Sequence, residues 1–315
     1  MVWVLILICC IADSGRPIVI AHRGASGYAI EHSEAAKAIA HAQGADYIEQ
    51  DVVLSKDRQF IVTHDITMEE TTNVKQLFPD RARPDGRFYF ADFTWVEIQR
   101  LSLHERTRRG SDQPALPDRF PGDAGQRVLR LSDEIRLLAG LDKTAGKQTG
   151  LYIELKSPSF HKKEFGTSMG EALIQELAAL GIQSERDRCF LQCFEMEELV
   201  DLHDRQCKLP LIQLLDRQPM DSELSRIAVF AKGIGPSLDL LATRGANDEI
   251  VSTGLVEAAR KEGLMLHPYT VRKHQQPRWS TSLEETHRFL IDQLKVDGFF
   301  TDYPDLGRAA VQSGK

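Results

Sequence analysis

The sequence contains no long uninterrupted apolar segment. No run of apolar residues reaches the roughly 18 positions that a membrane-spanning helix needs, which excludes a protein with several membrane spans. An excess of basic residues is also missing, because 39 Lys and Arg stand against 46 Asp and Glu, giving a net charge of −7. Sequence-independent binding of nucleic acid depends on positive charge, so we expect no nucleic-acid partner.

Cysteines are few, and none has the spacing of a zinc site. Only Cys189, Cys193 and Cys207 follow the N-terminal segment. Cys189 and Cys193 lie four residues apart in a predicted strand, about 13 Å in an extended chain, which is too far for a disulfide. We expect the cysteines to be core residues. A disulfide between Cys207 and either Cys189 or Cys193 is the alternative.

The first twelve residues form a short apolar stretch, followed at once by polar residues. This length suits the hydrophobic region of a signal peptide, with Cys10 and Ala12 as the small residues before the cleavage site. A basic segment before it is missing, and the alternative is a buried first strand or helix. We predict a signal peptide over residues 1–12, a secreted domain over residues 13–315, and no stable membrane span after processing.

The remaining chain has an ordinary globular composition, with 42% hydrophobic and 27% charged residues. Apolar strands alternate with amphipathic helices, which indicates βαβ units and a parallel sheet. A Gly-x-Gly-x-x-Gly motif does not follow the first strand, so a closed (β/α)8 TIM barrel is favoured over a doubly wound sheet. The predicted strands are 17–21, 47–54, 59–63, 151–155, 189–194, 211–215, 265–271 and 298–301.

Residues 65–131 interrupt this alternation. The interval includes a Pro-, Arg- and Asp-rich run from 105 to 127, and loops of this length in compact domains are commonly lids or binding loops. The alternative is a disordered surface insertion. Because the interval follows a strand, we expect it to overhang the carboxyl end of the barrel, where barrel active sites lie.

Carboxylates gather near the ends of two strands. Side chains two residues apart in a strand share a face, which places Glu49 beside Asp51, about 6.6 Å along the chain, and Glu154 beside Lys156. Like charges inside a barrel repel unless a cation compensates them, and hard divalent ions prefer carboxylate oxygens. The alternatives are an exposed strand face and a simple ion pair.

Two histidines occur where apolar strands end, namely His22, next to Arg23, and His64. A lone histidine in such a place is commonly structural. Two of them near an acidic cluster suit general acid and base catalysis near neutral pH, and an arginine suits bidentate binding of phosphate. Together these residues point to metal-assisted phosphoryl chemistry.

The motifs and their order identify a family. They read His22-Arg23-Gly24-Ala25-Ser26-Gly27, Glu49-Gln50-Asp51, His64-Asp65, Glu154-Leu155-Lys156 and Gly298-Phe-Phe-Thr-Asp302-Tyr-Pro304, with further matches over 191–194 and 265–271. From about residue 17 to 307 the chain resembles the glycerophosphodiester phosphodiesterase family, in particular its periplasmic, glycerophosphodiester-scavenging branch.

The resemblance implies a (β/α)8 barrel with a small lobe inserted after the second strand. It implies that Glu49, Asp51 and Glu154 bind one divalent cation, usually Ca²⁺ in this branch, with Mg²⁺ as the alternative. His22 and His64 become the catalytic acid and base, and Arg23 and Lys156 become phosphate contacts. The implied reaction is the hydrolysis of a small glycerophosphodiester, such as glycerophosphocholine, to sn-glycerol 3-phosphate and an alcohol, in the periplasm or outside the cell.

Two positions depart from the family pattern. Ile30-Glu31-His32-Ser33 stands where many members read Pro-Glu-Asn-Thr, and Tyr269 stands where many carry tryptophan. We therefore expect altered substrate-side contacts in the first segment and an altered wall of the glycerol pocket. The alternative functions are a phospholipase C- or D-like enzyme that acts on intact lipid and a non-catalytic binding protein. Since no member of the predicted site is missing, the last alternative is the weakest.

Overall fold

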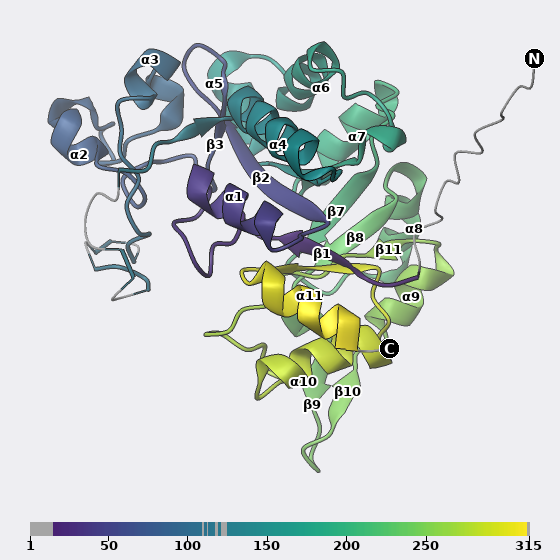
Figure 1. Cartoon of the computed structure of the whole chain (residues 1–315). Helices are drawn as coiled ribbons and strands as arrows, with labels where there is room; N and C mark the ends of the chain where they lie inside the picture. The colour runs from purple at the N-terminus through teal and green to yellow at the C-terminus, as the bar shows by residue number, and fades with distance from the viewer. Residues whose placement is uncertain (1–14, 109, 112, 117–118, 121–124, 314–315) are drawn as a thin grey trace, which may run out of the picture.

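Eight parallel strands form the centre of the protein (Figure 1). The computed structural model describes residues 15–108, 110–111, 113–116, 119–120 and 125–313, so the predicted signal peptide over residues 1–12 lies outside the described residues. The parallel strands follow the order β11–β8–β7–β6–β5–β2–β1–β12. Their bounds are β1 Ile18–Ala21, β2 Tyr47–Leu54, β5 Gly150–Leu155, β6 Cys189–Cys193, β7 Leu211–Leu215, β8 Gly233–Pro236, β11 Met265–Leu266 and β12 Gly298–Thr301.

Hydrogen bonds join the two ends of this series. The segment that begins with β11 bonds to β8 on one side and to β12 on the other. The Asp297 N–H donates to the Leu266 carbonyl at 3.1 Å, and the Phe300 N–H donates to the Pro268 carbonyl at 2.9 Å. The Val271 N–H returns a bond to the Phe300 carbonyl at 2.8 Å. These bonds close the sheet, and the predicted (β/α)8 barrel is confirmed.

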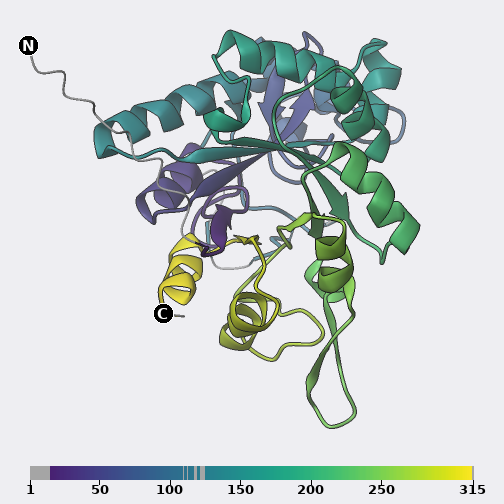
Figure 2. The ribbon, with the colours of Figure 1, turned by 90° about the vertical axis from the view of Figure 1, so that its right-hand side faces the viewer.

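Helices surround the barrel on its outer side (Figures 1 and 2). They are α1 Glu34–Ala42, α4 Leu131–Ala145, α5 Pro158–Phe165, α6 Met169–Ala179, α7 Met196–Asp204, α8 Asp221–Phe230, α9 Leu255–Lys261, α10 Leu283–Arg288, its π-helical continuation Phe289–Gln293, and α11 Pro304–Ser313. A hairpin of β9 Ala242–Arg244 and β10 Ile250–Ser252 projects away from the barrel in Figure 2. Within the described ranges, no helix has the length and apolar character of a membrane span.

Apolar side chains fill both sides of the barrel wall. Strands buried on both faces read as nearly continuous apolar runs, and every residue of β6 and β7 is buried. Inside the barrel a cluster of large side chains blocks the centre: Ile20, Tyr47, Tyr152, Phe190, Ile212 and Phe300. Cys189 and Cys193 are buried in the core between strands and helices, as predicted, and neither is bridged to Cys207. Because the interior is filled, a site can form only at an end of the barrel, and barrel active sites lie at the carboxyl ends of the strands.

A lobe with its own core lies between β3 Phe60–Val62 and β4 Leu129–Arg130. It contains α2 Val74–Leu77, α3 Trp95–Ile98 and two 3-10 helices, Pro79–Arg81 and Phe90–Asp92. Its buried residues form a cluster separate from the barrel core: Met68, Val74, Phe88, Phe90, Phe93, Ile98, Leu101, Leu103 and Val128. Ile30, Val53 and Ile61, from the loop after β1 and from β2 and β3, complete this cluster. The described part of this interval is therefore a packed structure.

The strand before His64 does not belong to the barrel wall, which corrects its inclusion among the predicted barrel strands. β3 runs antiparallel to β2 as the second half of a hairpin. The Thr63 N–H donates to the Asp51 carbonyl at 2.9 Å, so the chain returns to the level of Asp51 just before His64. A short turn after a long β2 makes this return possible, and it brings His64 to the acidic cluster.

Candidate active site

The seven residues predicted from the sequence converge at the carboxyl ends of the barrel strands. The register between β2 and β5 places Asp51 opposite Glu154, and Glu49 precedes Asp51 on the same face of β2. The other residues lie just after β1, β3 and β5. A cavity of ≈ 240 Å³, the reaction cavity, is lined by six of the seven: His22, Arg23, Glu49, His64, Glu154 and Lys156.

Three buried carboxylates lie together, and two of them, Glu49 and Glu154, line this cavity. Glu49, Asp51 and Glu154 are 3%, 1% and 6% exposed, and one oxygen of each lies within 4.8 Å of the others. Burial raises the pKa of Glu49 well above its usual range, and the charges of Asp51 and Glu154 add to the rise. Burial also raises the pKa of Glu154 to about 7, although Lys156 opposes the rise.

Asp51 behaves differently because cationic and donor groups surround it. Burial alone would raise its pKa, but the charge of Lys156 and a hydrogen bond from His32 hold it well below the usual range. Asp51 Oδ1 has no hydrogen-bond partner among the described residues. Carboxylate oxygens are the donors that hard divalent cations prefer. A cation would relieve the repulsion in the cluster and use this oxygen, so the three carboxylates fit a divalent-cation site.

Both histidines are held by an aspartate through the same ring nitrogen. The Nδ1 atom of His22 lies 2.6 Å from Asp302 Oδ1, and that of His64 lies 2.8 Å from Asp65 Oδ1. Burial and the charge of Arg23 lower the pKa of His22 to about 4, against the opposing effect of Asp302. Burial and nearby cations also lower the pKa of His64. A carboxylate on Nδ1 fixes the tautomer and leaves Nε2 for a substrate.

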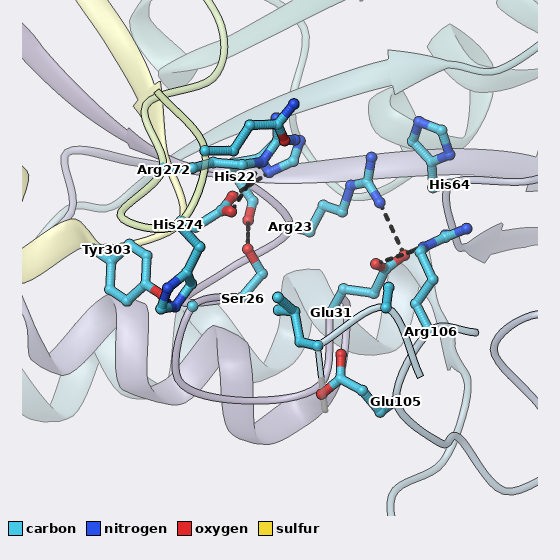
Figure 3. A pocket seen from close by; sticks show the side chains of 15 residues that line it. His22, Arg23, Ser26, Glu31, His64, Glu105, Arg106, Arg272, His274 and Tyr303 are labelled. Atoms are coloured by element: carbon cyan, nitrogen blue, oxygen red, sulfur yellow. Dashed lines mark hydrogen bonds and ion pairs between the residues drawn. The ribbon is translucent and has the colours of Figure 1, made fainter. Parts of the chain in front are cut away.

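Two cationic side chains border the carboxylates. Arg23 has a left-handed backbone, with φ of +56°, and its N–H donates to Glu49 Oε2 at 2.8 Å. Its guanidinium donates to Glu31 Oε1 at 3.0 Å (Figure 3). The Lys156 ammonium donates to Glu154 Oε1 at 2.6 Å. Because these cations line the reaction cavity next to the acidic cluster, they can bind an anionic group there.

The segment Ile30–Ser33 contacts two of the predicted site residues, Arg23 and Asp51. Glu31 accepts a hydrogen bond from Arg23, and the Nε2 atom of His32 donates to Asp51 Oδ2 at 2.8 Å. His32 is 3% exposed, so its side chain is packed against a carboxylate of the acidic cluster. Glu31, which contacts Arg23, is shared with the family pattern, whereas His32, which contacts Asp51, stands in place of its asparagine.

Three further residues take part that were given no role from the sequence. Asp65 and Asp302, quoted above only as parts of motifs, hold His64 and His22. Arg272 donates through Nε to Asp302 Oδ2 at 3.1 Å. Arg272 follows β11 outside any recognisable motif, so the sequence contains no indication of its role. Tyr269 lines the reaction cavity, and its hydroxyl donates to the Leu215 carbonyl at 3.0 Å.

A second cavity of ≈ 610 Å³, the outer cavity, adjoins the first and shares His22, Arg23, His64 and Arg272 with it. Figure 3 shows these residues together with side chains from the lobe. The lobe contributes Glu105, Arg106, Ala115 and Leu116 to the lining. The reaction cavity and the outer cavity thus form one hollow, with the four shared residues at the junction.

The fold and this set of side chains define a class of protein. Three kinds of side chain meet at the carboxyl end of the barrel, where barrel enzymes carry their active sites. They are carboxylates suited to a divalent cation, two histidines held by aspartates, and the cationic side chains of Arg23 and Lys156. These groups suit the hydrolysis of phosphodiesters, because cationic groups stabilise the negative charge that develops on the phosphoryl oxygens and histidines can transfer the protons. The class is therefore a barrel phosphodiesterase.

Comparison with known proteins identifies the family. The sequence profile of the glycerophosphoryl diester phosphodiesterase family matches residues 22–306. A glycerophosphodiester phosphodiesterase of Haemophilus influenzae is 34% identical, with 92% of this chain and 88% of that protein covered. One from Treponema pallidum is 33% identical, with 92% and 90% covered. The chain belongs to the glycerophosphoryl diester phosphodiesterase family.

A solved structure agrees with this assignment. The crystal structure of a glycerophosphodiester phosphodiesterase from Agrobacterium tumefaciens superposes with a TM-score of 0.60 at 26% identity, and 93% of this chain and 99% of that chain are covered. The likeness extends over nearly the whole chain.

Proposed function

We propose that this protein hydrolyses small glycerophosphodiesters, such as glycerophosphocholine, to sn-glycerol 3-phosphate and an alcohol. The observation that carries the proposal is the meeting of three buried carboxylates, two cationic side chains and two aspartate-held histidines at one cavity, in a chain of this family. The adjoining outer cavity offers room for the leaving alcohol on the far side of the shared residues.

In this reaction the two histidines exchange protons with the substrate and the attacking water. One neutral histidine accepts a proton from the water at Nε2. The other carries a proton on both ring nitrogens once the phosphodiester anion is bound, because a nearby negative charge favours the charged imidazolium, and it donates its Nε2 proton to the departing alcohol oxygen. Asp302 and Asp65 hold the two rings through Nδ1, which keeps each Nε2 directed to the substrate. Arg23 and Lys156 bind the phosphoryl oxygens and stabilise the charge that builds on them.

Glu49, Asp51 and Glu154 would hold one divalent cation, with Ca²⁺ as the expected ion and Mg²⁺ as the alternative. When bound, such an ion neutralises charge on the phosphoryl group and orients the reacting groups. The clustering and raised pKa values of Glu49 and Glu154 support this role.

We further propose that residues 1–12 form an export signal and that the domain over 13–315 acts in the periplasm or outside the cell. The apolar stretch at the N-terminus supports this proposal.

The test is the release of sn-glycerol 3-phosphate from glycerophosphocholine by the purified protein. After treatment with EDTA we expect no turnover, and after addition of Ca²⁺ or Mg²⁺ we expect turnover to return, with the better cation identifying the preferred ion. Absence of turnover with both cations in a folded sample contradicts the proposal. Release of head group from phosphatidylcholine vesicles, with no hydrolysis of glycerophosphocholine, supports the lipid-acting alternative.

A variant of one histidine provides the control for the assigned chemistry. We expect His64→Ala to lower kcat by about 10²–10⁴-fold, the usual contribution of a general acid or base. Its Ca²⁺ affinity, measured by calorimetry, stays near that of the wild type, because His64 lies outside the acidic cluster. Loss of cation binding in this variant contradicts the separation of roles.

A further inference from the structure

One arginine of the lobe binds two acidic side chains of the active-site loops. Arg106 donates through Nε and Nη2 to the two oxygens of Glu31, at 2.9 and 2.6 Å. Its Nη1 donates to Asp65 Oδ2 at 2.5 Å. The pairing with Glu31 is the two-point contact that a planar guanidinium makes with a carboxylate. Arg106 thus joins the lobe to the loop after β1 and to the loop after β3.

Each of these acidic side chains holds a residue of the reaction cavity. Glu31 Oε1 also accepts from Arg23 Nη1 at 3.0 Å, and Asp65 Oδ1 lies 2.8 Å from His64 Nδ1. Two short chains of contacts therefore lead from one guanidinium, the first through Glu31 to Arg23 and the second through Asp65 to His64. Figure 3 shows Arg106, Glu31 and Arg23 in line at the outer cavity.

The ionisation of Glu31 and Asp65 is consistent with fixed chains of contacts from Arg106 to Arg23 and to His64. Burial alone would raise the pKa of Glu31, but the charges of Arg106 and Arg23 hold it well below its usual range. The pKa of Asp65 is also lowered, because hydrogen bonding from His64 and the charge of Arg106 outweigh burial. Both side chains are then ionised acceptors, and the Nδ1 atom of His64 is the donor to Asp65.

We propose that Arg106 is a positioning residue for this reaction: it sets Arg23 and His64 in place by binding Glu31 and Asp65. The inference rests on the proposed function and gives the lobe a defined part in it. Arg106 lines the outer cavity but acts on the reaction through the two side chains that it binds. The expected result of its loss is an active site whose groups are all present but misplaced.

The lobe offers a matched control in Arg87. This arginine makes a comparable pair of contacts inside the lobe, with Glu69 Oε1 at 2.5 Å and Glu70 Oε1 at 3.5 Å. Its side chain is 29% exposed, against 20% for Arg106. Arg87 and Arg106 share Glu70, which lies 3.5 Å from a guanidinium nitrogen of each. Among the described residues the ion-pair partners of Arg87 do not include Glu31 or Asp65, so Arg87→Ala tests whether loss of any ion-paired arginine of the lobe has the same effect.

The experiment compares Arg106→Ala, Arg106→Lys and Arg87→Ala with the wild type in glycerophosphocholine hydrolysis. We expect Arg106→Ala to lower kcat by about 10²-fold, the effect of misplacing reacting groups by about 1 Å, while Ca²⁺ affinity measured by calorimetry is retained. Added guanidinium at millimolar concentration restores part of kcat in this variant alone. Arg106→Lys remains impaired because it lacks the two-point contact.

Other results overturn the inference. An equal loss of kcat in Arg106→Ala and Arg87→Ala, without rescue by guanidinium, assigns Arg106 a general structural role. Near-normal activity of Arg106→Lys shows that the two-point contact with Glu31 is not needed. Calorimetric binding of sn-glycerol 3-phosphate tests the inference apart from turnover. If the wild type does not hydrolyse glycerophosphocholine, the proposed function fails, but weaker binding in Arg106→Ala than in Arg87→Ala still supports positioning of Arg23. Equal binding in both variants contradicts it.

Discussion

At the scale of single residues, His32 shows how the site holds a charge in the interior. Its Nε2 donates to Asp51 Oδ2 at 2.8 Å, and both side chains are almost fully buried. A buried carboxylate needs donors or a cation to stay ionised. Groups that hydrogen-bond to metal ligands orient those ligands and affect the affinity for the metal. His32 therefore occupies the place of an orienting residue beside the acidic cluster.

We predict that His32→Ala weakens the binding of Ca²⁺ or Mg²⁺ by about 10–100-fold, the usual effect of losing such a partner. His32→Gln, whose amide nitrogen can replace Nε2 as a donor, retains most of the affinity. Isothermal titration calorimetry on metal-free protein measures both. Equal affinity in the wild type and in His32→Ala, with both folded, shows that Asp51 does not need this hydrogen bond.

At the scale of elements, a buried ion pair connects α1 and α4 behind β2. Lys37 on α1 and Glu134 on α4 are both fully buried, and their charged atoms lie 2.9 Å apart. The Lys37 ammonium also donates to the backbone carbonyl of Glu49, and Glu134 accepts from the Gln50 amide at 2.9 Å. The two helices are thus bound to the part of β2 that carries two carboxylates of the site.

We predict that Lys37→Met and Glu134→Leu each lower the free energy of unfolding by about 3–5 kcal/mol, because removal of one partner leaves the other buried without an opposite charge. The double variant Lys37→Met with Glu134→Leu recovers a large part of this loss, since paired buried charges can be replaced by apolar groups at little cost. Urea unfolding of the four proteins provides the comparison. Additive losses in the double variant contradict the pairing.

At the scale of the whole molecule, three histidines far apart in the chain are buried without charge. Burial lowers the pKa of His161 to about 4, with Glu164 opposing the change, and lowers those of His267 and His287 to about 3 and about 4. In an unfolded chain the pKa of histidine is about 6.5. Between these values the unfolded state binds more protons than the folded state, so stability falls as the pH decreases.

We predict that the free energy of unfolding is unaffected by these groups above about pH 6.5 and decreases steadily from there toward pH 4. His161 contacts the rings of Phe160 and Phe165 on α5, and neither of its ring nitrogens has a partner among the described residues. Replacement by leucine removes one titrating group, so the slope against pH decreases by up to about 1.4 kcal/mol per pH unit. Urea unfolding at several pH values measures the slope, and an unchanged slope in His161→Leu contradicts the assignment.

The sequence by itself determined the barrel and the kinds of residue at its mouth. Apolar strands with polar residues where they end are visible locally, so Glu49, Asp51, Glu154 and His22 could be placed at strand ends without a structure. The strand β8, Gly233–Pro236, was not predicted, because its Gly-Ile-Gly-Pro sequence has little of the β-branched and aromatic character of strands.

Only the tertiary structure decided which groups hold one another. Asp302 reaches His22 across 280 positions, and Arg106 reaches Glu31 across 75. The first contact depends on the closure of the barrel between its first and last strands, and the second depends on the docking of the lobe on the loop after β1. Neither event leaves a local pattern in the sequence, because side chains that meet across closed strands and docked lobes are related by geometry and not by spacing.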